Sequence, residues 1–589
     1  MGFEYALVHV KYTVPPAVLL TLFYRPLFTR LDVYKIVFLV TIAVVSTIPW
    51  DSYLIRTGIW SYPSHVIVGP KLFEIPLEEV FFFFIQTYNT SLLYIILSRP
   101  TFQPAYLRVE RQHSHPLGPC NQQWRWYKRL GQLVLAVTIG WGLHQVVDKG
   151  AGTYTGLILI WALPFLLLLW SLAYQFILGL PLPNTLLPIA LPTLYLWIID
   201  TLALKRGTWV ISSGTKFGFH LWDGLEIEEA LFFLLTNTLI VFGQLAFDNA
   251  LTILYTFPKL FPSPAVLPAP IALVKALCTP ASRYDEARLI GLQEAVTRLK
   301  RKSRSFYFAS STFQGQLRSD LMLLYSFCRV ADDLVDNASS AEDAKKWIAR
   351  LQRFLDMAYG SVEKADTSVE QYVMDSFPQD TRSALLQLPC SSLSRQPLHD
   401  LLRGFEMDLA FNSVPPIQTE ADLEVYAERV AGTVAQMCNE LIFHIYCTSL
   451  SLEDQRRIIL SGNRMGIALQ YVNIARDISV DAKIGRVYLP KTWLKKAGKT
   501  YRSVLLDPEG VGVEELRTKL LDKAFALYEN AREAIEELPA EARGPIRVAV
   551  ESYMEIGRVL RRNGYAVKAG KATVPKWRRI RVAWKTLNQ

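Results

Sequence analysis

Residues 470–490 read QYVNIARDISVDAKIGRVYLP, and the spacing of the polar side chains in this segment predicts a helix with one chemically active face. Asn473, Asp477 and Asp481 follow one another at four-residue intervals, which aligns their side-chain oxygens along one side of an α-helix. Gln470 lies three residues earlier, on nearly the same face. The whole chain has a formal charge of +10, so an acidic stripe contrasts with the positive net charge of the chain. Like charges held close together need a neutralising partner.

A second acidic stretch, YSFCRVADDLVD at residues 325–336, repeats this arrangement with Asp332 and Asp336 on one helix face. Two such helices facing each other would concentrate oxygen ligands of the kind that suit Mg²⁺, which usually takes further ligands from substrate phosphates. The alternative is that each cluster is a solvated helix face paired with basic residues. Both clusters are embedded in apolar sequence and each has a neighbouring arginine, Arg329 or Arg476, which favours a metal and diphosphate site.

The chain outside these stretches divides into an apolar half and a charged half. It has 589 residues, of which 51% are hydrophobic, so at least two domains are expected, one of them in lipid. We predict an all-α protein with a membrane domain at 1–250, a Pro-rich linker at 251–285 and a soluble helical domain at 286–589. The predicted membrane spans are residues 6–26, 34–50, 77–97, 131–147, 155–178, 185–204 and 228–247.

The distribution of basic residues predicts an orientation in the membrane. The loops around 25–35 and 98–130 hold nine Lys and Arg residues, whereas the opposite loops hold six. An integral membrane protein with its soluble domain in the cytosol is therefore expected, and the organelle is left open. The first apolar stretch lacks a small-residue cleavage site, so we interpret it as a retained span. No nucleic-acid partner is expected.

Four motifs of the soluble half, in order, resemble those of the squalene and phytoene synthases. They are SRSFYFAS (303–310), YSFCRVADDLVD (325–336), YAERVAGTVAQM (426–437) and NIARDISVDAKIGRVYLP (473–490). The resemblance implies an all-α enzyme that joins two prenyl diphosphates head to head. GRVYLP is similar to the phytoene synthases, because squalene synthases usually show a Phe-Trp-Pro ending at that point.

The resemblance also implies roles for individual residues. Tyr426 would lie beside the reacting carbons, Phe306 would line the cavity, and Tyr553 would lie near the leaving diphosphate. Lys571 would replace an arginine that relatives commonly carry, and lysine offers charge without a planar fork. The implied ligands of Mg²⁺ are Asp332, Asp336, Asn473, Asp477 and Asp481, and the implied diphosphate contacts or supports of the metal ligands are Ser303, Arg329, Gln470 and Arg476.

The implied reaction condenses two molecules of geranylgeranyl diphosphate to phytoene through a cyclopropyl diphosphate, with release of two diphosphates. A squalene-type synthase would instead require NADPH to quench the last cation. The sequence contains no G-x-G-x-x-G dinucleotide motif. Squalene synthases also lack a Rossmann fold, so the absence of this motif leaves the squalene-type alternative open.

The membrane half contains an internal repeat. DSYLIRTGIW (51–60) and DTLALKRGTW (200–209) share Asp, Gly and Trp at identical spacing. Downstream, PLEEVFFFF (76–84) corresponds to EIEEALFFL (226–234). We predict two copies of one unit, each with an aspartate at a helix end, a polar loop and a di-glutamate that opens the next helix, on the same side of the membrane.

Acidic residues at the ends of Phe-rich helices suit a proton-driven olefin cyclisation, in which aromatic faces stabilise the cation. The alternative is helix capping, since carboxylates are favoured in the first turn of a helix. This half resembles the membrane lycopene β-cyclases of fungi and their half-sized paired relatives in bacteria and archaea. The resemblance implies protonation of a terminal double bond of lycopene, ring closure and proton loss. The candidate acids are Glu78, Glu79, Glu228 and Glu229, and Asp51 or Asp200 would orient the acid or serve as base.

Together the two halves resemble the fungal family that fuses a lycopene cyclase to a phytoene synthase. The implied partners are geranylgeranyl diphosphate, lycopene and related carotenes, the lipid bilayer, and a phytoene desaturase for the steps between the two reactions. No cofactor is evident for the cyclase half, since no flavin motif is present. The alternative is a squalene-type synthase tethered to a non-catalytic membrane anchor or scaffold.

Overall fold

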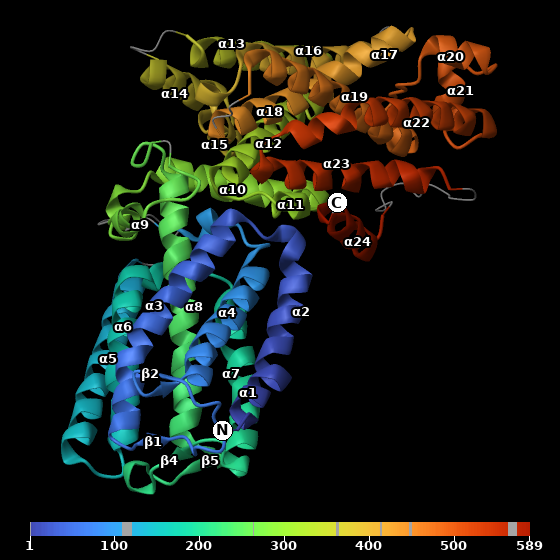
Figure 1. Ribbon diagram of the computed structural model, residues 1–589. Helices are drawn as coiled ribbons and strands as arrows, with labels where there is room; N and C mark the ends of the chain where they lie inside the picture. Colours follow the sequence, from blue (N-terminus) through green and yellow to red (C-terminus); the bar gives the residue numbers. More distant parts are fainter. Residues whose placement is uncertain are drawn as a thin grey trace. The chain divides into compact units, whose positions relative to one another are not determined.

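The computed structural model consists almost entirely of helices and forms two compact units, Met1–Leu289 and Ile290–Gln589 (Figure 1). The prediction of an all-α protein is confirmed, because the strands among the described residues are only two or three residues long. The structure describes residues 2–108, 121–262, 264–360, 365–412, 415–446, 450–562 and 574–588.

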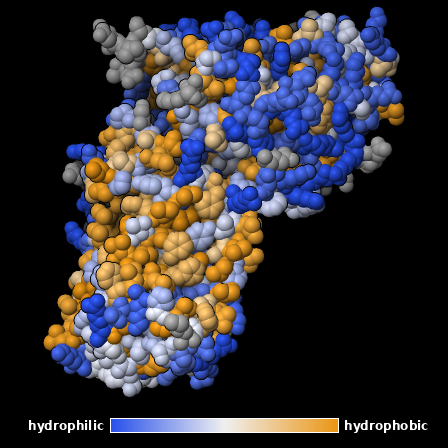
Figure 2. All heavy atoms as spheres, viewed as in Figure 1, coloured by the Kyte–Doolittle hydropathy of each residue, from blue (hydrophilic) through white to orange (hydrophobic). Residues whose placement is uncertain are grey.

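The first unit is a bundle of seven helical segments long and apolar enough to cross a membrane, as the sequence predicts. Its surface in Figure 2 is a broad hydrophobic band with polar residues at the end of the bundle that carries the strands. The first span is α1 (Glu4–Val8), a π-helical turn (His9–Thr13), α2 (Val14–Tyr24) and a 3₁₀ turn (Arg25–Leu27), and the others are α3 (Arg30–Arg56), α4 (Leu77–Ser98), α5 (Asn121–Asp148), α6 (Thr153–Gly179), α7 (Leu182–Arg206) and α8 (Ile227–Thr256).

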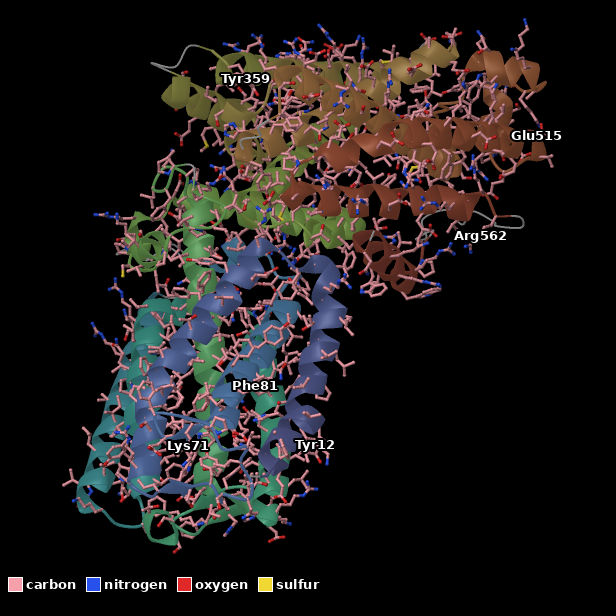
Figure 3. The ribbon with its side chains drawn as sticks, viewed as in Figure 1. Tyr12, Lys71, Phe81, Tyr359, Glu515 and Arg562 are labelled. Carbon is pink, nitrogen blue, oxygen red and sulfur yellow. The ribbon has the colours of Figure 1, made fainter. Side chains whose placement is uncertain are left out.

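Short strands at one end of this bundle reproduce the sequence repeat in three dimensions. A two-stranded hairpin precedes α4, and an equivalent hairpin precedes α8. Strand β1 of the first copy pairs with β4 of the second, so both copies lie at the same end of the bundle, as predicted. Lys71 in Figure 3 marks the hairpin of the first copy. The strands are β1 (Trp60–Ser61), β2 (Lys71–Leu72), β3 (Ile75–Pro76), β4 (Val210–Ile211), β5 (His220–Trp222) and β6 (Leu225–Glu226).

Local sequence signals fix several helix ends in this unit. Thr29 and Asp32 form a reciprocal capping box at the start of α3, with the Asp32 N–H donating to Thr29 Oγ1 at 3.2 Å. Gly207 ends α7 in the left-handed conformation at φ 67°, where a side chain would be strained. The D-x6-G-x-W repeat therefore carries a helix stop as well as its aspartate and tryptophan.

The second unit packs its helices around one large apolar core that includes Phe327, Phe354 and Tyr528. Ser451 caps the long helix α19 by accepting the Asp454 N–H at 3.1 Å. The helices are α10 (Glu286–Lys302), α11 (Arg304–Ser310), α12 (Gly315–Asp336), α13 (Ala341–Ala358), α14 (Ala365–Ser376), α15 (Gln379–Leu386), α16 (Arg395–Leu409), α17 (Glu420–Ala427), α18 (Thr433–Tyr446), α19 (Leu452–Lys483), α20 (Lys491–Lys496), α21 (Tyr501–Leu506), α22 (Val511–Ala531), α23 (Ala540–Leu560) and α24 (Lys576–Leu587).

The segment predicted as a linker, 251–285, is partly helical. It contains the last turns of α8, which runs to Thr256, and the short helix α9 (Pro270–Leu277). Pro270 occupies the first turn of α9, where its missing N–H costs no hydrogen bond. A proline therefore begins α9 in this segment, and another proline follows the end of α8.

Candidate functional sites

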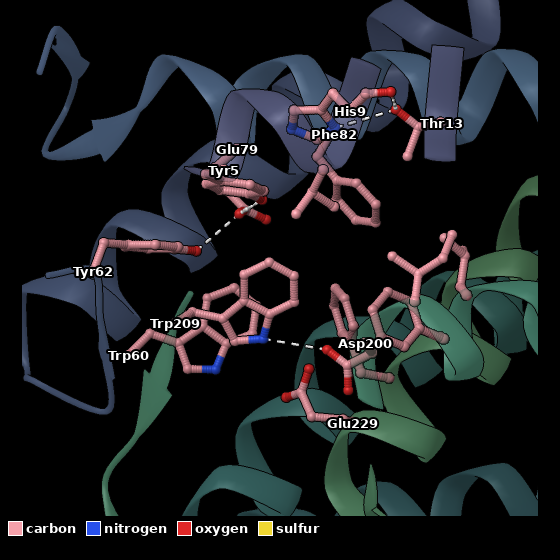
Figure 4. A pocket seen from close by; sticks show the side chains of 15 residues that line it. Tyr5, His9, Thr13, Trp60, Tyr62, Glu79, Phe82, Asp200, Trp209 and Glu229 are labelled. Carbon is pink, nitrogen blue, oxygen red and sulfur yellow. Dashed lines mark hydrogen bonds between the residues drawn. The ribbon is translucent and has the colours of Figure 1, made fainter. Parts of the chain in front are cut away.

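A pocket inside the first unit brings together carboxyl groups from both copies of the repeat. Glu79 from the first turn of α4 and Glu229 from the first turn of α8 approach it from different sides, and Asp200 from α7 joins them (Figure 4). The described lining contains no lysine or arginine. It is otherwise mostly aromatic and aliphatic, including Trp60, Phe82, Trp209, Phe232 and Phe233.

Glu79 accepts hydrogen bonds from two phenols. Tyr62, in the loop after β1, donates to Glu79 Oε2 at 2.8 Å, and Tyr5 of α1 donates to the same oxygen. The rings of Tyr5 and Tyr62 stack with their centroids 5.9 Å apart. Glu79 is thus held on one wall of the pocket by two O–H donors.

Glu229 has a different set of partners. Its Oε1 accepts the Tyr154 O–H at 2.6 Å. Asp200 accepts the indole N–H of Trp209 at 3.2 Å, so the aspartate and the tryptophan of the second repeat bind each other. Asp51, the aspartate of the first repeat, is completely buried and has no hydrogen-bond partner within the described part of the chain. It does not line the pocket.

The first glutamate of each pair turns away from the pocket. Glu78 Oε1 accepts the backbone N–H of Val68 at 2.6 Å, and Glu228 Oε1 accepts that of Phe217 at 2.7 Å. Each bond ties the loop of its own repeat to the start of the helix. In both copies, therefore, the first glutamate binds the loop and the second faces the pocket.

Several polar residues of this pocket were not predicted from the sequence. His9 lines the pocket, with Nε2 3.0 Å from the Glu78 carbonyl oxygen and Nδ1 3.2 Å from Thr13 Oγ1. The three tyrosines that donate to the glutamates were also missed, because single tyrosines are usually packing residues. For Tyr5 and Tyr154, which lie in membrane spans, the sequence signal is a hydroxyl at a position that phenylalanine could fill.

In the second unit, the two acidic stretches lie on α12 and α19 and are joined by an arginine. Asp336, at the end of α12, accepts a hydrogen bond at 2.9 Å from Arg486, which lies just beyond α19. Arg486 belongs to the GRVYLP segment, which was considered only for its product preference. Arg486 therefore links the end of α12 to the segment that follows α19.

The stripe on α19 forms a network with its neighbouring arginine and with α23. Arg476 donates to Asp477 Oδ1 at 2.7 Å and to Asn473 Oδ1 at 2.6 Å. The Tyr553 O–H donates to the same Asn473 oxygen at 2.8 Å. The ring of Phe306 stacks on Tyr553 at 5.9 Å between centroids. These five residues, predicted separately, lie together.

Three further predicted residues occupy the surroundings of this network. Arg329 lies 3.0 Å from Asp332 in an ion pair and also contacts Asp333. Ser303 caps α11, with its Oγ 3.5 Å from the Phe306 N–H. Gln470 is half-buried on α19, one turn before Asn473. Lys571 lies outside the described residues.

The carboxyl groups here are destabilised in their charged form. Burial and the charge of Asp336 raise the pKa of Asp332 to about 7, and burial and the charge of Asp477 raise the pKa of Asp481 to about 7. Cations bound beside Asp332 and Asp481 would stabilise the charged carboxylates and so lower both pKa values. Among the described residues no three acidic, His or Cys side chains enclose a metal position by themselves. This donor set fits Mg²⁺, which completes its shell with water and substrate phosphate.

Tyr426 is held by a carboxylate that the sequence analysis missed. Asp408 of α16 accepts hydrogen bonds from Tyr426 at 3.3 Å and from Tyr488 at 2.8 Å, and the two rings stack at 4.9 Å. Burial raises the pKa of Asp408 to about 6. Asp408 belongs to neither of the two acidic patterns found in the sequence, so only the fold reveals it.

Arg579, on α24, is a second residue that the sequence analysis missed. Burial and then the charge of Arg476 lower the pKa of Arg579. Arg579 therefore lies close enough to the Arg476 network to add positive charge beside it.

Comparison with known proteins finds relatives that cover both halves of the chain. Residues 299–578 match the squalene/phytoene synthase family. The whole chain is 68% identical to the bifunctional lycopene cyclase/phytoene synthase of Leptosphaeria maculans and 57% identical to that of Gibberella fujikuroi, with full coverage of each chain. Among solved structures, a dehydrosqualene synthase matches 51% of this chain and 96% of its own at 24% identity and a TM-score of 0.41. On the full-length relatives, the chain belongs to the family of fungal bifunctional lycopene cyclase/phytoene synthases.

Proposed function

We propose that the second unit condenses two geranylgeranyl diphosphates to phytoene and that the first unit cyclises the ends of lycopene. The synthase assignment is supported above all by the joining of the two acidic stretches through Asp336 and Arg486. The cyclase assignment is supported by a pocket in which one glutamate from each repeat faces aromatic rings. Neither observation requires the other.

In the synthase unit, the residues that would hold Mg²⁺ are Asp332, Asp336, Asn473, Asp477 and Asp481. Bound Mg²⁺ neutralises the diphosphate oxygens and so makes diphosphate a better leaving group. Arg329 and Arg476 keep the acidic side chains oriented through the bonds described above and offer N–H groups to the diphosphates. Ser303 and Gln470 contact the same oxygens or support the metal ligands.

The apolar side chains guide the carbon chemistry. After the first allylic diphosphate ionises, the double bond of the second substrate attacks it to give a cyclopropyl diphosphate. A second ionisation, rearrangement and proton loss then give phytoene. Tyr426, fixed by Asp408, lies beside the reacting carbons, and the stacked rings of Phe306 and Tyr553 cover the cations.

The product is tested with the purified full chain in lipid nanodiscs. Geranylgeranyl or farnesyl diphosphate is supplied with Mg²⁺, with and without NADPH, and the hydrocarbons are identified by mass. Phytoene formed without reductant is the expected result. Squalene formed only with NADPH would overturn the assignment.

In the cyclase pocket, Glu229 is the acid and Glu79 the base. Glu79 accepts two phenol O–H groups, whereas Glu229 accepts one. Hydrogen bonds donated to a carboxylate stabilise its charged form, so Glu79, which accepts more of them, is the group suited to receive a proton. Asp200 and Trp209 support the wall beside Glu229.

The proton balance of this reaction is closed. Glu229 gives its proton to the terminal double bond of lycopene, and the resulting cation closes a six-membered ring. Glu79 then takes a proton from the ring carbon to leave the β-ionone end, and the two carboxyl groups exchange protons with water before the next turnover. No electrons are gained or lost, and aromatic faces such as Trp60 and Phe232 stabilise the cation.

This mechanism predicts a mass change. In D₂O, each ring closed by the full chain in nanodiscs gains one deuterium, so the product is heavier by about one mass unit per ring. The same mass spectrum shows whether one or both ends of lycopene are cyclised. Product without deuterium would exclude protonation as the initiating step.

The seven apolar helices are compatible with membrane insertion. We place the amino terminus outside and the synthase unit in the cytosol, on the distribution of basic residues. A phytoene desaturase acting between the two reactions is a proposed partner. Protease accessibility of the synthase unit in sealed vesicles of known orientation tests the topology.

A further inference from the structure

Helix α24 presents large apolar side chains to solvent at the surface of the synthase unit. Trp577, Ile580 and Trp584 are 63%, 54% and 50% exposed. Their spacing of three and four residues places them in one stripe along the helix. An exposed stripe of two tryptophans and an isoleucine on an otherwise polar surface indicates a binding face.

The opposite side of α24 is fixed to its own unit. Ala583 and Thr586 are almost fully buried, and α24 packs against α23. Arg578 forms an ion pair with the buried Glu555 of α23 at 2.5 Å. The orientation of the helix is thereby set, so the tryptophan stripe faces outward as part of the fold.

The charge of α24 selects the kind of partner. The helix contains five Lys and Arg residues and no acidic residue. Arg581 and Lys585, which flank the stripe, are both exposed. Tryptophan and aliphatic side chains bordered by basic residues are the pattern of helices that lie in the interface of a membrane containing anionic lipids.

The chain itself brings this unit close to lipid. The last candidate span, α8, ends at Thr256, and α10 begins at Glu286. The helix α9 occupies 8 of the residues between them. Residues 257–285 therefore tether the synthase unit to the last candidate span.

We propose that the exposed face of α24, formed by Trp577, Ile580, Arg581, Trp584 and Lys585, docks on the anionic lipid headgroup surface of the membrane that the first unit spans. Helix α24 packs against α23, which carries Tyr553, and the Tyr553 O–H donates to Asn473 of the proposed diphosphate site. Docking would hold this side of the synthase unit at the lipid surface, where long-chain prenyl substrates and hydrocarbon products partition. The lipid contact itself does not depend on which hydrocarbon is made.

Site-specific photo-cross-linking in the full chain tests the contact. p-Benzoylphenylalanine replaces Ile580 in one variant and Val511 in a control, since Val511 is an exposed apolar residue of the same unit, 80% exposed at the start of α22. Each variant is reconstituted in nanodiscs with alkyne-tagged phosphatidylserine and is irradiated. We expect cross-links to phosphatidylserine at position 580 and at least about five-fold fewer at position 511.

A charge reversal separates lipid binding from simple proximity. Arg581→Glu with Lys585→Glu, in the variant that carries the probe at position 580, should lower the phosphatidylserine yield at least about five-fold, because even one basic residue near an anionic surface contributes about that factor. Tagged phosphatidylcholine, whose headgroup has no net charge, gives the reference cross-linking yield.

Three outcomes would overturn the proposal. Cross-links from position 580 mainly to the chain's own membrane helices would make the stripe an internal interface. Equal lipid yields at positions 580 and 511 would show only general closeness to the bilayer. A phosphatidylserine yield that the charge reversal leaves unchanged would remove the anionic surface as the partner.

Discussion

The two units of this chain both gather carboxyl groups, but they surround them with opposite partners. In the membrane unit, the pocket glutamates accept hydrogen bonds from tyrosines, and the described lining has no lysine or arginine. In the synthase unit, the aspartates lie against Arg329, Arg476 and Arg486. Acids among phenols and aromatic rings can exchange protons, whereas acids crossed by arginines form a site for metal ions and phosphates.

The difference follows from what each site must stabilise. A cation formed on a hydrocarbon is stabilised by ring faces and would be repelled by guanidinium groups. A departing diphosphate carries several negative charges and needs cations on every side. The same residue type, a helical carboxylate, therefore serves either chemistry according to its neighbours.

The largest expected effect comes from removing one metal ligand. Asp477→Asn leaves the shape of the stripe but removes a charge that would bind Mg²⁺ and that holds Arg476. Phytoene formation should fall by about 10³-fold or more, while lycopene cyclisation persists, because the two sites are separate. Pigments from cells that make geranylgeranyl diphosphate, with and without a desaturase, report the synthase, and added lycopene reports the cyclase.

Glu453→Gln is the matched control for this change. Glu453 is an exposed acid on the same helix, α19, in its first turn. Its substitution should leave phytoene formation within about two-fold, as for most surface positions. Loss of both activities in a folded Asp477→Asn protein of normal abundance would contradict the independence of the two sites.

The next largest effect should appear in the membrane unit. Glu229→Gln keeps the volume and hydrogen-bonding capacity of the side chain but removes the transferable proton. Lycopene cyclisation should fall by about 10²- to 10⁴-fold, the usual range for a general acid, with phytoene formation unchanged. Measurement of β-ring products from added lycopene in nanodiscs decides this. If all four Glu→Gln variants of the two pairs retain cyclisation, the acid is none of these glutamates. If the unsubstituted chain does not cyclise lycopene, the membrane unit is an anchor or scaffold.

How far the sequence predicts these sites depends on whether their residues follow a helical period. The stripes on α12 and α19 and the duplicated di-glutamates repeat at fixed spacing, so they could be found, and the fold class followed from apolar span lengths. Asp408, Tyr62 and Tyr154 could not be found, because each comes from an isolated position on a different element. The separate tasks of Glu78 and Glu79 were also invisible, since adjacent residues on a helix point about 100° apart and only packing decides which faces the pocket.

A smaller effect is expected from the phenol that holds the proposed acid. Tyr154→Phe removes the O–H that Glu229 accepts at 2.6 Å but keeps the ring. The acid loses its orientation and not its proton, so cyclisation should slow by about five- to thirty-fold, as for a lost buried hydrogen bond of about 1–2 kcal/mol. The pigment assay with added lycopene measures this rate. A loss as large as that of Glu229→Gln would assign the proton transfer to the phenol instead.

The smallest effect should come from the other glutamate of the same pair. Glu228 accepts the backbone N–H of Phe217 at 2.7 Å and ties the second-repeat loop to α8. Glu228→Gln can still accept this bond through its amide oxygen and loses only the contribution of charge, about 1 kcal/mol of unfolding free energy. Thermal unfolding in nanodiscs should therefore begin a few degrees lower, with cyclisation reduced less than about ten-fold. If Glu228→Gln abolished cyclisation as fully as Glu229→Gln at unchanged thermal stability, the loop-holding role would be wrong, and both glutamates of the pair would belong to the chemistry.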